Sequence, residues 1–257
     1  MNYLFALHTD VGIKKKTNQD SLCVKEASTP NGNILMALVC DGMGGLEKGE
    51  VASATIIKAF SKWFQEELPY DLSKRDIEGE IRYKWDRIIK QQNQIIGEYG
   101  RKNHIQLGST ITVILFLHTG TYIIGHVGDS RAYRITEQNI EVLTEDQTVV
   151  ANEVKKGRMT LEQAEQDPRR NVLLQCVGAS RIVEPVFITG KAEKDDCFML
   201  CSDGFRHVVS QEEIYSAFLP SLQKNEEMMK ENIVRLIDLN KTREETDNIS
   251  SILIKLV

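Results

Sequence analysis

Short apolar runs alternate with longer amphipathic segments along this chain of 257 residues. The apolar runs are rich in β-branched and aromatic residues and stop at turn-forming residues, so they predict β-strands. They cover residues 34–40, 109–117, 121–127, 131–135, 197–201 and 249–257. The tetrapeptide HTGT at 118–121 lies between the second and third runs and is short enough to predict a β-hairpin connection.

Two long segments carry apolar side chains at every third or fourth position, which predicts amphipathic helices over residues 50–68 and 76–99. The two apolar stripes consist of Ile56, Phe60, Trp63 and Phe64, and of Ile77, Ile81, Trp85, Ile88, Ile95 and Tyr99. Aromatic stripes at this spacing favour core packing over a cofactor site. Residues 222–247 predict a further amphipathic helix that ends in a charged loop.

The predicted strands do not alternate singly with helices, which disfavours a doubly wound parallel sheet. We therefore expect an α+β fold in which antiparallel sheets are covered by helices. Residues 149–171 are polar and helix-prone, with Gly157 and Pro168 as breaks and few apolar anchors, so they predict a surface excursion. No repeat or linker divides the chain, and we expect one domain over residues 1–257.

Composition excludes several classes of protein. The formal net charge of −5 disfavours nucleic-acid and anionic-membrane partners, which need clustered Lys and Arg. Neither a transmembrane run of about 20 apolar residues nor the layout of a signal peptide is present, so a cytoplasmic protein is expected. The five cysteines, among them Cys40, Cys197 and Cys201 in apolar runs, favour reduced core thiols. The five histidines lack ligand spacing, so a zinc site is not expected.

The stretch LVCDGMGGLEKGE at 38–50 places four glycines after an apolar run. A phosphate loop of the form G-x-x-x-x-G-K-[ST] would need lysine where Glu50 stands. A dinucleotide fingerprint G-x-G-x-x-G that starts at Gly42 would need glycine where Glu47 stands. Both nucleotide-binding interpretations fail on a required residue, which leaves open a plain Asp-Gly turn or a carboxylate presented to a metal.

Five aspartates follow or precede the apolar runs, namely Asp20, Asp41, Asp129, Asp203 and Asp247. Each alone could simply end a strand, since Asp is a common turn residue. Strands stacked in one core can bring their ends to one rim, however, where the carboxylates would repel unless a cation neutralised them. Oxygen ligands without His or Cys select Mg²⁺ or Mn²⁺, and two such ions about 3.5 to 4 Å apart can activate a bridging water. Spacing alone leaves the turn and the metal interpretations equally open.

Eight short motifs follow one another along nearly the whole chain: TDVGIKKKTNQDS, LVCDGMGGLEKGEVAS, GST, HVGDSRAY, LTEDQT, DPRRNVLLQCVG, MLCSDGF and TDNISSILI. This ordered series resembles that of the metal-dependent protein serine/threonine phosphatases of type 2C, in their bacterial form. The resemblance implies an α-β-β-α sandwich of two antiparallel sheets with helices on each outer face. It also implies hydrolysis of phosphoserine and phosphothreonine in proteins by a hydroxide that bridges two ions of Mn²⁺ or Mg²⁺.

The resemblance implies a role for each aspartate. Asp41 would bridge the two ions, with the Gly42 carbonyl as a second ligand, so the glycines would let the backbone turn its oxygen toward a metal. Asp203 and Asp247 would complete the coordination of one ion. Asp20 would hydrogen-bond the attacking water.

The resemblance also implies a third, weaker metal at Asp129 and a flap beside the active site at about 149–171. Three positions depart from the family pattern. Lys15 stands where the family has a phosphate-binding arginine, and lysine offers a point charge instead of a bidentate fork. Gln19 replaces a glutamate of many members, and Met43 stands where animal members have a histidine proposed as the general acid. Leaving-group protonation would then come from water.

Rival phosphatase chemistries lack their motifs, because neither C-x₅-R nor D-x-D occurs. The remaining alternative is a catalytically silent member of the same fold that binds phosphoproteins. The retained aspartates disfavour it, and Lys15 is the feature that favours it. The expected partners are phosphorylated proteins, which would be targets of a bacterial serine/threonine kinase, and a monomer is expected.

Overall fold

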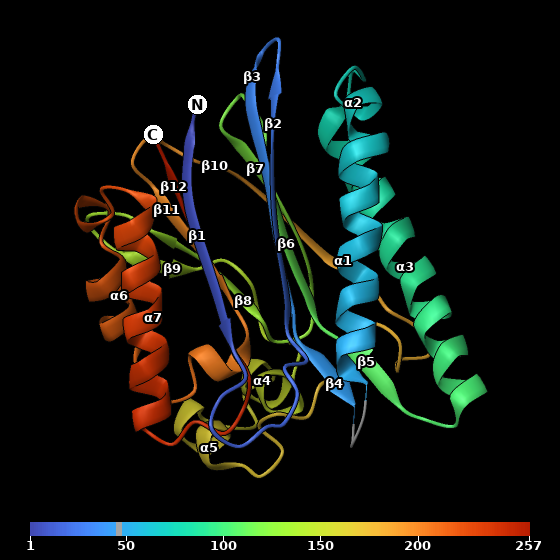
Figure 1. The fold of residues 1–257 in the computed structure, drawn as a ribbon. Helices are drawn as coiled ribbons and strands as arrows, with labels where there is room; N and C mark the ends of the chain where they lie inside the picture. Colours follow the sequence, from blue (N-terminus) through green and yellow to red (C-terminus); the bar gives the residue numbers. More distant parts are fainter. Residues whose placement is uncertain (45–47) are drawn as a thin grey trace.

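The computed structural model describes residues 1–44 and 48–257, so residues 45–47 of the glycine-rich stretch lie outside the described part. Two antiparallel sheets face each other, and helices cover the outer face of each sheet (Figure 1). The chain termini lie at one end of the sandwich, while α4 and α5 lie at the opposite end (Figure 1). The predicted α+β fold, with its α-β-β-α layering, is confirmed.

Every strand pairing in the two large sheets is antiparallel. The first sheet has the order β1 (Tyr3–Asp10), β12 (Ile249–Leu256), β11 (Cys197–Cys201), β8 (Arg131–Ile135) and β9 (Ile140–Val142). The second has the order β10 (Val186–Lys191), β7 (Thr121–Val127), β6 (Ile111–Phe116), β3 (Gly32–Cys40) and β2 (Ser21–Thr29). A small third sheet pairs β4 (Gly42–Gly44) with β5 (Leu107–Ser109).

The helices form two outer layers. The second sheet is covered by α1 (Gly49–Glu66), the short α2 (Leu68–Asp71) and α3 (Ile77–Asn103), and the first by α6 (Gln211–Phe218) and α7 (Glu226–Thr242) (Figure 1). The chain also contains α4 (Val149–Lys155), α5 (Leu161–Gln166) and the 3₁₀ helices η1 (Asp203–Phe205) and η2 (Pro220–Leu222). Good caps explain several helix starts, since Asp76 accepts the Gly79 amide at α3 and Thr160 and Ser210 form capping boxes.

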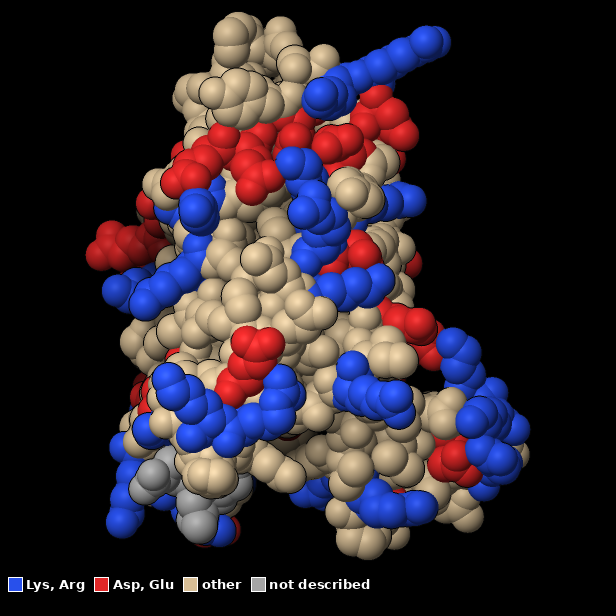
Figure 2. Space-filling model, turned by 90° about the vertical axis from the view of Figure 1, so that its right-hand side faces the viewer, with Lys and Arg blue, Asp and Glu red and all other residues tan. Residues whose placement is uncertain are grey.

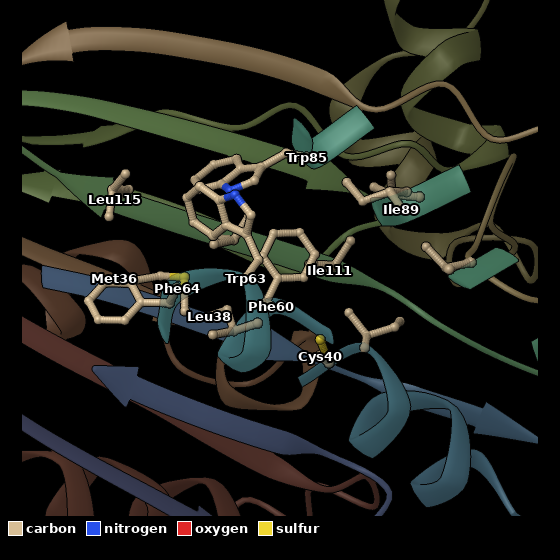
Figure 3. Close-up of a cluster of buried hydrophobic side chains, with 14 of the residues drawn as sticks. Met36, Leu38, Cys40, Phe60, Trp63, Phe64, Trp85, Ile89, Ile111 and Leu115 are labelled. Atoms are coloured by element: carbon tan, nitrogen blue, oxygen red, sulfur yellow. The ribbon is translucent and has the colours of Figure 1, made fainter. Parts of the chain in front are cut away.

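Three apolar clusters hold these layers together, one between the sheets and one under each helical layer. Under α1 and α3, the indole of Trp85 makes edge-on contacts with Phe60 and Trp63 (Figure 3). Met36, Leu38 and other side chains of the second sheet complete this cluster. The core on both faces of the second sheet explains why its central strands are apolar throughout rather than alternating.

Two details of the sequence prediction were wrong. The predicted strand 109–117 is two strands that break at Thr110, because the Thr110 amide donates to the Asp41 carbonyl instead of continuing a ladder. On α3, Ile95 is 45% exposed, and the fully buried side chains are Ile81, Trp85 and Ile89. These three buried residues are spaced four apart and define the buried face of the helix, and Ile95 lies outside that row.

No helix within the described residues is long and apolar enough to span a membrane. On the face covered by α1 and α3, acidic and basic side chains are intermixed (Figure 2).

Candidate active site

The structure brings the five predicted aspartates to one rim of the sandwich. Asp41 directly follows β3, Asp203 begins η1 just after β11, and Asp129 lies in the turn after β7. Asp20 immediately precedes β2, and Asp247 lies just before β12. Burial, followed by the charges of the other four carboxylates, raises the pKa of Asp41 well above its usual value, so the five side chains are electrostatic neighbours.

Reciprocal hydrogen bonds fix the backbone at Asp41. Its amide donates to the Thr110 hydroxyl and its carbonyl accepts the Thr110 amide, both at 2.9 Å. The same hydroxyl lies 2.8 Å from that of Ser130, one residue after Asp129. The break between β5 and β6 at Thr110 therefore ties together two of the carboxylate-bearing turns.

Two of the carboxylates are buried with oxygens that lack a protein partner. Both carboxylate oxygens of Asp20, and Oδ1 of Asp203, lack a hydrogen-bond partner within the described part of the chain. Burial, together with the charges of Asp203 and Asp247, raises the pKa of Asp20 to about 7, against the opposing effect of the nearby Ser250 and Ser202 hydroxyls. The pKa of Asp203 instead lies well below its usual range, because hydrogen bonding and charge from His207 outweigh the opposing effect of burial.

The glycines of the turn after Asp41 allow two backbone segments to touch. A Cβ on Gly42 would lie 2.3 Å from the carbonyl oxygen of Gly49, the first residue of α1. The Gly42 amide donates to the Gln19 carbonyl at 3.2 Å. With its amide oriented to satisfy both contacts, the Gln19 side chain donates to the Gly42 carbonyl at 3.2 Å and accepts the Gly49 amide at 3.1 Å. Only glycine fits this close approach, and Gln19 reaches the oxygen that was predicted to face a metal.

Lys15 and Asp247 form an ion pair at this rim, with Lys15 Nζ 2.9 Å from Asp247 Oδ1. The buried side chain of Asn248, the residue after Asp247, organises the loop of residues 11–19 that carries Lys15. It accepts the Gln19 amide and donates to the carbonyls of Val11 and Thr17. The loop that carries Lys15 is therefore fastened to the start of β12.

The turn at Asp129 is held by an arginine pair. Arg206 donates to the Asp129 carbonyl at 3.0 Å and lies 3.1 Å from Asp146 Oδ2. Arg131 makes a two-pronged ion pair with the same Asp146 carboxylate, at 2.7 and 2.8 Å. Burial, followed by the charge of Asp203, raises the pKa of the Asp129 side chain to about 7, against the effect of Arg206.

Sequence reasoning missed His207 and Glu245, which also lie at the rim. His207 stands between Asp203 and Glu245, with 3.3 Å contacts to a carboxylate oxygen of each. Burial alone would lower the pKa of His207, but the contacts with Asp203 and Glu245 raise it to about 10. The spacing of four residues between Asp203 and His207 was the available signal.

The donor chemistry of this rim fits a divalent metal ion. Carboxylate and carbonyl oxygens are the ligands that Mg²⁺ and Mn²⁺ prefer. A cation would neutralise the crowded carboxylates and satisfy the unpartnered oxygen of Asp203, and a water bound to it could satisfy Asp20. As placed, no three His, Cys, Asp or Glu side chains of residues 1–44 and 48–257 form a group ready to hold an ion. Asp247 is bonded instead to Lys15. Metal binding therefore requires small side-chain shifts.

Comparison with known proteins identifies the relatives of this chain. The family described as "Protein phosphatase 2C" matches residues 12–240. The serine/threonine protein phosphatase PstP of Mycobacterium tuberculosis is 31% identical over 98% of this chain, which spans 45% of that protein. A Streptococcus agalactiae serine/threonine phosphatase superposes with a TM-score of 0.83 and 27% identity over 100% of both chains.

A solved structure of the PstP catalytic domain is in complex with two manganese ions. It superposes on this chain with a TM-score of 0.79 and 29% identity, over 99% of this chain and 98% of that one. This similarity, together with the oxygen-rich rim, supports a divalent metal cofactor. The chain therefore belongs to the protein phosphatase 2C family of metal-dependent protein serine/threonine phosphatases.

Proposed function

We propose that this phosphatase binds two ions of Mn²⁺ or Mg²⁺ at the aspartate rim and there hydrolyses phosphoserine and phosphothreonine in proteins. The observation that carries the proposal is the crowding of the carboxylates of Asp20, Asp41 and Asp203, with unpartnered buried oxygens on Asp20 and Asp203. Like charges held this close destabilise the protein unless a cation compensates them. The two manganese ions of the related PstP catalytic domain give further support.

Five groups would hold the ions. Asp41, whose pKa is raised by burial and by the charges of the other four aspartates, would bridge both ions, with the Gly42 carbonyl beside it. Asp203 and Asp247 would complete the coordination of one ion. Asp247 would have to give up its ion pair with Lys15 to do so. Asp129, whose pKa is raised by burial and by Asp203, would bind a third and weaker ion.

Other side chains would act on the water and the phosphate. When bound, the ions supply Lewis-acid chemistry, lowering the pKa of a water molecule and neutralising phosphate oxygens. The buried Asp20 carboxylate has both oxygens free to accept a hydrogen bond from that water and so to orient it. Met43 offers no proton, so the leaving alkoxide would take its proton from solvent.

The substrate would be a phosphorylated protein, including targets of a bacterial serine/threonine kinase. Residues 149–171 would form the flap that contributes to substrate choice. In this segment Val150 and Ala164 are the buried residues of the two short helices. Such sparse anchoring suits a segment that adapts to a protein partner.

The test is metal-dependent turnover of p-nitrophenyl phosphate and of a phosphothreonine peptide. We expect no measurable turnover in excess chelator and recovery on addition of Mn²⁺ or Mg²⁺, because the chain supplies no protein nucleophile in this mechanism. Native thiol alkylation should leave activity intact, since burial raises the pKa of Cys201 to about 12 and keeps it protonated. Mn²⁺ binding without turnover of either substrate would instead favour the catalytically silent alternative.

Replacing Lys15 with alanine is expected to lower kcat/KM about 10- to 100-fold, through KM more than kcat. A charge-assisted contact to phosphate contributes about 1.5 to 3 kcal/mol, and phosphate is charged in the ground state as well as in the transition state. Lys15 is 41% exposed, and its long side chain can turn from Asp247 toward a bound phosphate. Steady-state kinetics at saturating Mn²⁺ measures the effect.

Lys14 and Lys16 are the matched controls for this prediction, because they lie in the same basic run. Alanine at either position should change kcat/KM less than at Lys15, whereas arginine at Lys15 should keep or improve it through two-pronged contact. Equal small effects at all three lysines would show that the phosphate contact lies elsewhere.

A further inference from the structure

One histidine joins two segments that carry predicted metal ligands. His207 Nε2 lies 3.3 Å from Asp203 Oδ2, and His207 Nδ1 lies 3.3 Å from Glu245 Oε2. The side chains are largely shielded from solvent, with exposures of 19% for His207, 11% for Asp203 and 6% for Glu245. Both ring nitrogens are therefore used, and the imidazole has little freedom to rotate.

Glu245 uses its other oxygen to hold the second ligand segment. Its Oε1 accepts the backbone amide of Thr246 at 2.7 Å and that of Asp247 at 2.9 Å. The Asp247 side chain in turn accepts the amide of Asn248 at 2.8 Å. One carboxylate thus fixes the backbone from which Asp247 projects, while its other oxygen holds His207.

The turn that presents Glu245 is itself anchored to the segment of Asp203. The Glu245 amide donates to the Asn240 carbonyl at 3.0 Å, and Glu244 adopts a left-handed φ of 62°. The fully buried Asn240 side chain donates to the Phe205 carbonyl of η1 at 3.0 Å. The end of α7 and the 3₁₀ turn of Asp203 are thereby joined by backbone and by side chains.

We propose that His207 and Glu245 form a positioning pair that keeps the carboxylates of Asp203 and Asp247 in the mutual arrangement needed to bind one divalent ion. This inference rests on the proposed metal-dependent function, because it assigns those two aspartates to the same ion. Partners of this kind orient ligands without touching the metal, and their loss typically weakens metal affinity about 10- to 100-fold. Neither residue would contact the substrate.

The experiment measures Mn²⁺ affinity directly, by the free Mn²⁺ signal in electron paramagnetic resonance of the metal-stripped full chain. His207→Ala and Glu245→Ala should each bind Mn²⁺ about 10- to 100-fold more weakly than the native protein. Activity lost at low Mn²⁺ should return in part as Mn²⁺ is raised. Glu245→Gln keeps an oxygen for the two backbone amides and should lose less affinity than Glu245→Ala.

The control is His118→Ala, at the far end of β6 from Thr110 and so away from the rim, which should keep native Mn²⁺ affinity. The double variant His207→Ala/Glu245→Ala should bind Mn²⁺ no more weakly than the poorer single variant, because residues that act as one unit are not additive. Thermal unfolding in chelator reports on folding separately from metal binding.

Native or tighter Mn²⁺ affinity in folded His207→Ala would overturn the inference, since removal of a positively charged ring would then be the dominant effect. Fully additive losses in the double variant would also overturn it. Both results leave the proposed function standing as long as the native chain needs Mn²⁺ for turnover. Failure of the native chain to bind Mn²⁺ would overturn the proposed function itself.

Discussion

Replacing Asp41 with alanine is expected to lower kcat/KM by about a thousandfold or more, because a metal-activated water contributes several kcal/mol to hydrolysis. Burial, followed by the charges of Asp20, Asp203, Asp129 and Asp247, raises the pKa of Asp41, which places this carboxylate among all the others. No other single substitution would remove a ligand from both proposed ions. Steady-state hydrolysis of p-nitrophenyl phosphate across a Mn²⁺ titration measures the loss.

The matched control is Asp196→Ala, which removes a buried aspartate paired with Arg134 through a 2.6 Å contact. Asp196 lies before β11, at the opposite end of that strand from Asp203. We expect this variant to unfold at a lower temperature yet to keep kcat/KM close to native when folded. If Asp41→Ala retained turnover within about tenfold of native at saturating Mn²⁺, Asp41 would not bridge the ions.

The fold could be predicted from the sequence where burial imposes a local pattern. The apolar strand β3 and the stripe of α1 were recognisable because their side chains pack against covered faces. The edge strand β2 and strand β1 were not predicted, since their side chains are mostly half-buried and show neither a continuous apolar run nor clear alternation. The break at Thr110 depends on a hydrogen bond to Asp41, 69 residues away. No local pattern could reveal it.

The candidate site was predictable to the extent that strand ends carry acidic residues. Asp41 and Asp203 follow apolar strands, so their meeting at one rim follows from strand stacking. The surroundings depend on tertiary contacts. His207 lacked the spacing of a metal ligand, yet it lies between Asp203 and a glutamate, Glu245, that is 38 residues later in the chain. Likewise, only the structure shows that Lys15 bonds to Asp247.

Replacing Asn248 with alanine is expected to destabilise the protein by about 3 kcal/mol, because three hydrogen bonds of about 1 kcal/mol each are lost. The Asn248 side chain is 3% exposed. It accepts the Gln19 amide at 2.9 Å and donates to the carbonyls of Val11 and Thr17 at 3.0 and 3.2 Å. For a chain of this size the melting temperature should fall by about 6 to 12 °C. Thermal unfolding in chelator measures this loss without a contribution from bound metal.

The same substitution should also lower kcat/KM more than its effect on stability explains, because the released loop carries Lys15 and leads into Asp20. Asn93→Ala separates the two effects. Asn93 likewise fastens a loop, accepting the Gly178 amide at 2.6 Å and donating to the Ser180 carbonyl at 3.0 Å, but it lies on α3 outside the aspartate rim. We expect Asn93→Ala to lower the melting temperature while a folded sample keeps near-native kcat/KM. Equal kinetic losses in folded Asn93→Ala and Asn248→Ala would show that the loop does not position the catalytic groups, and that Asn248 acts on stability alone.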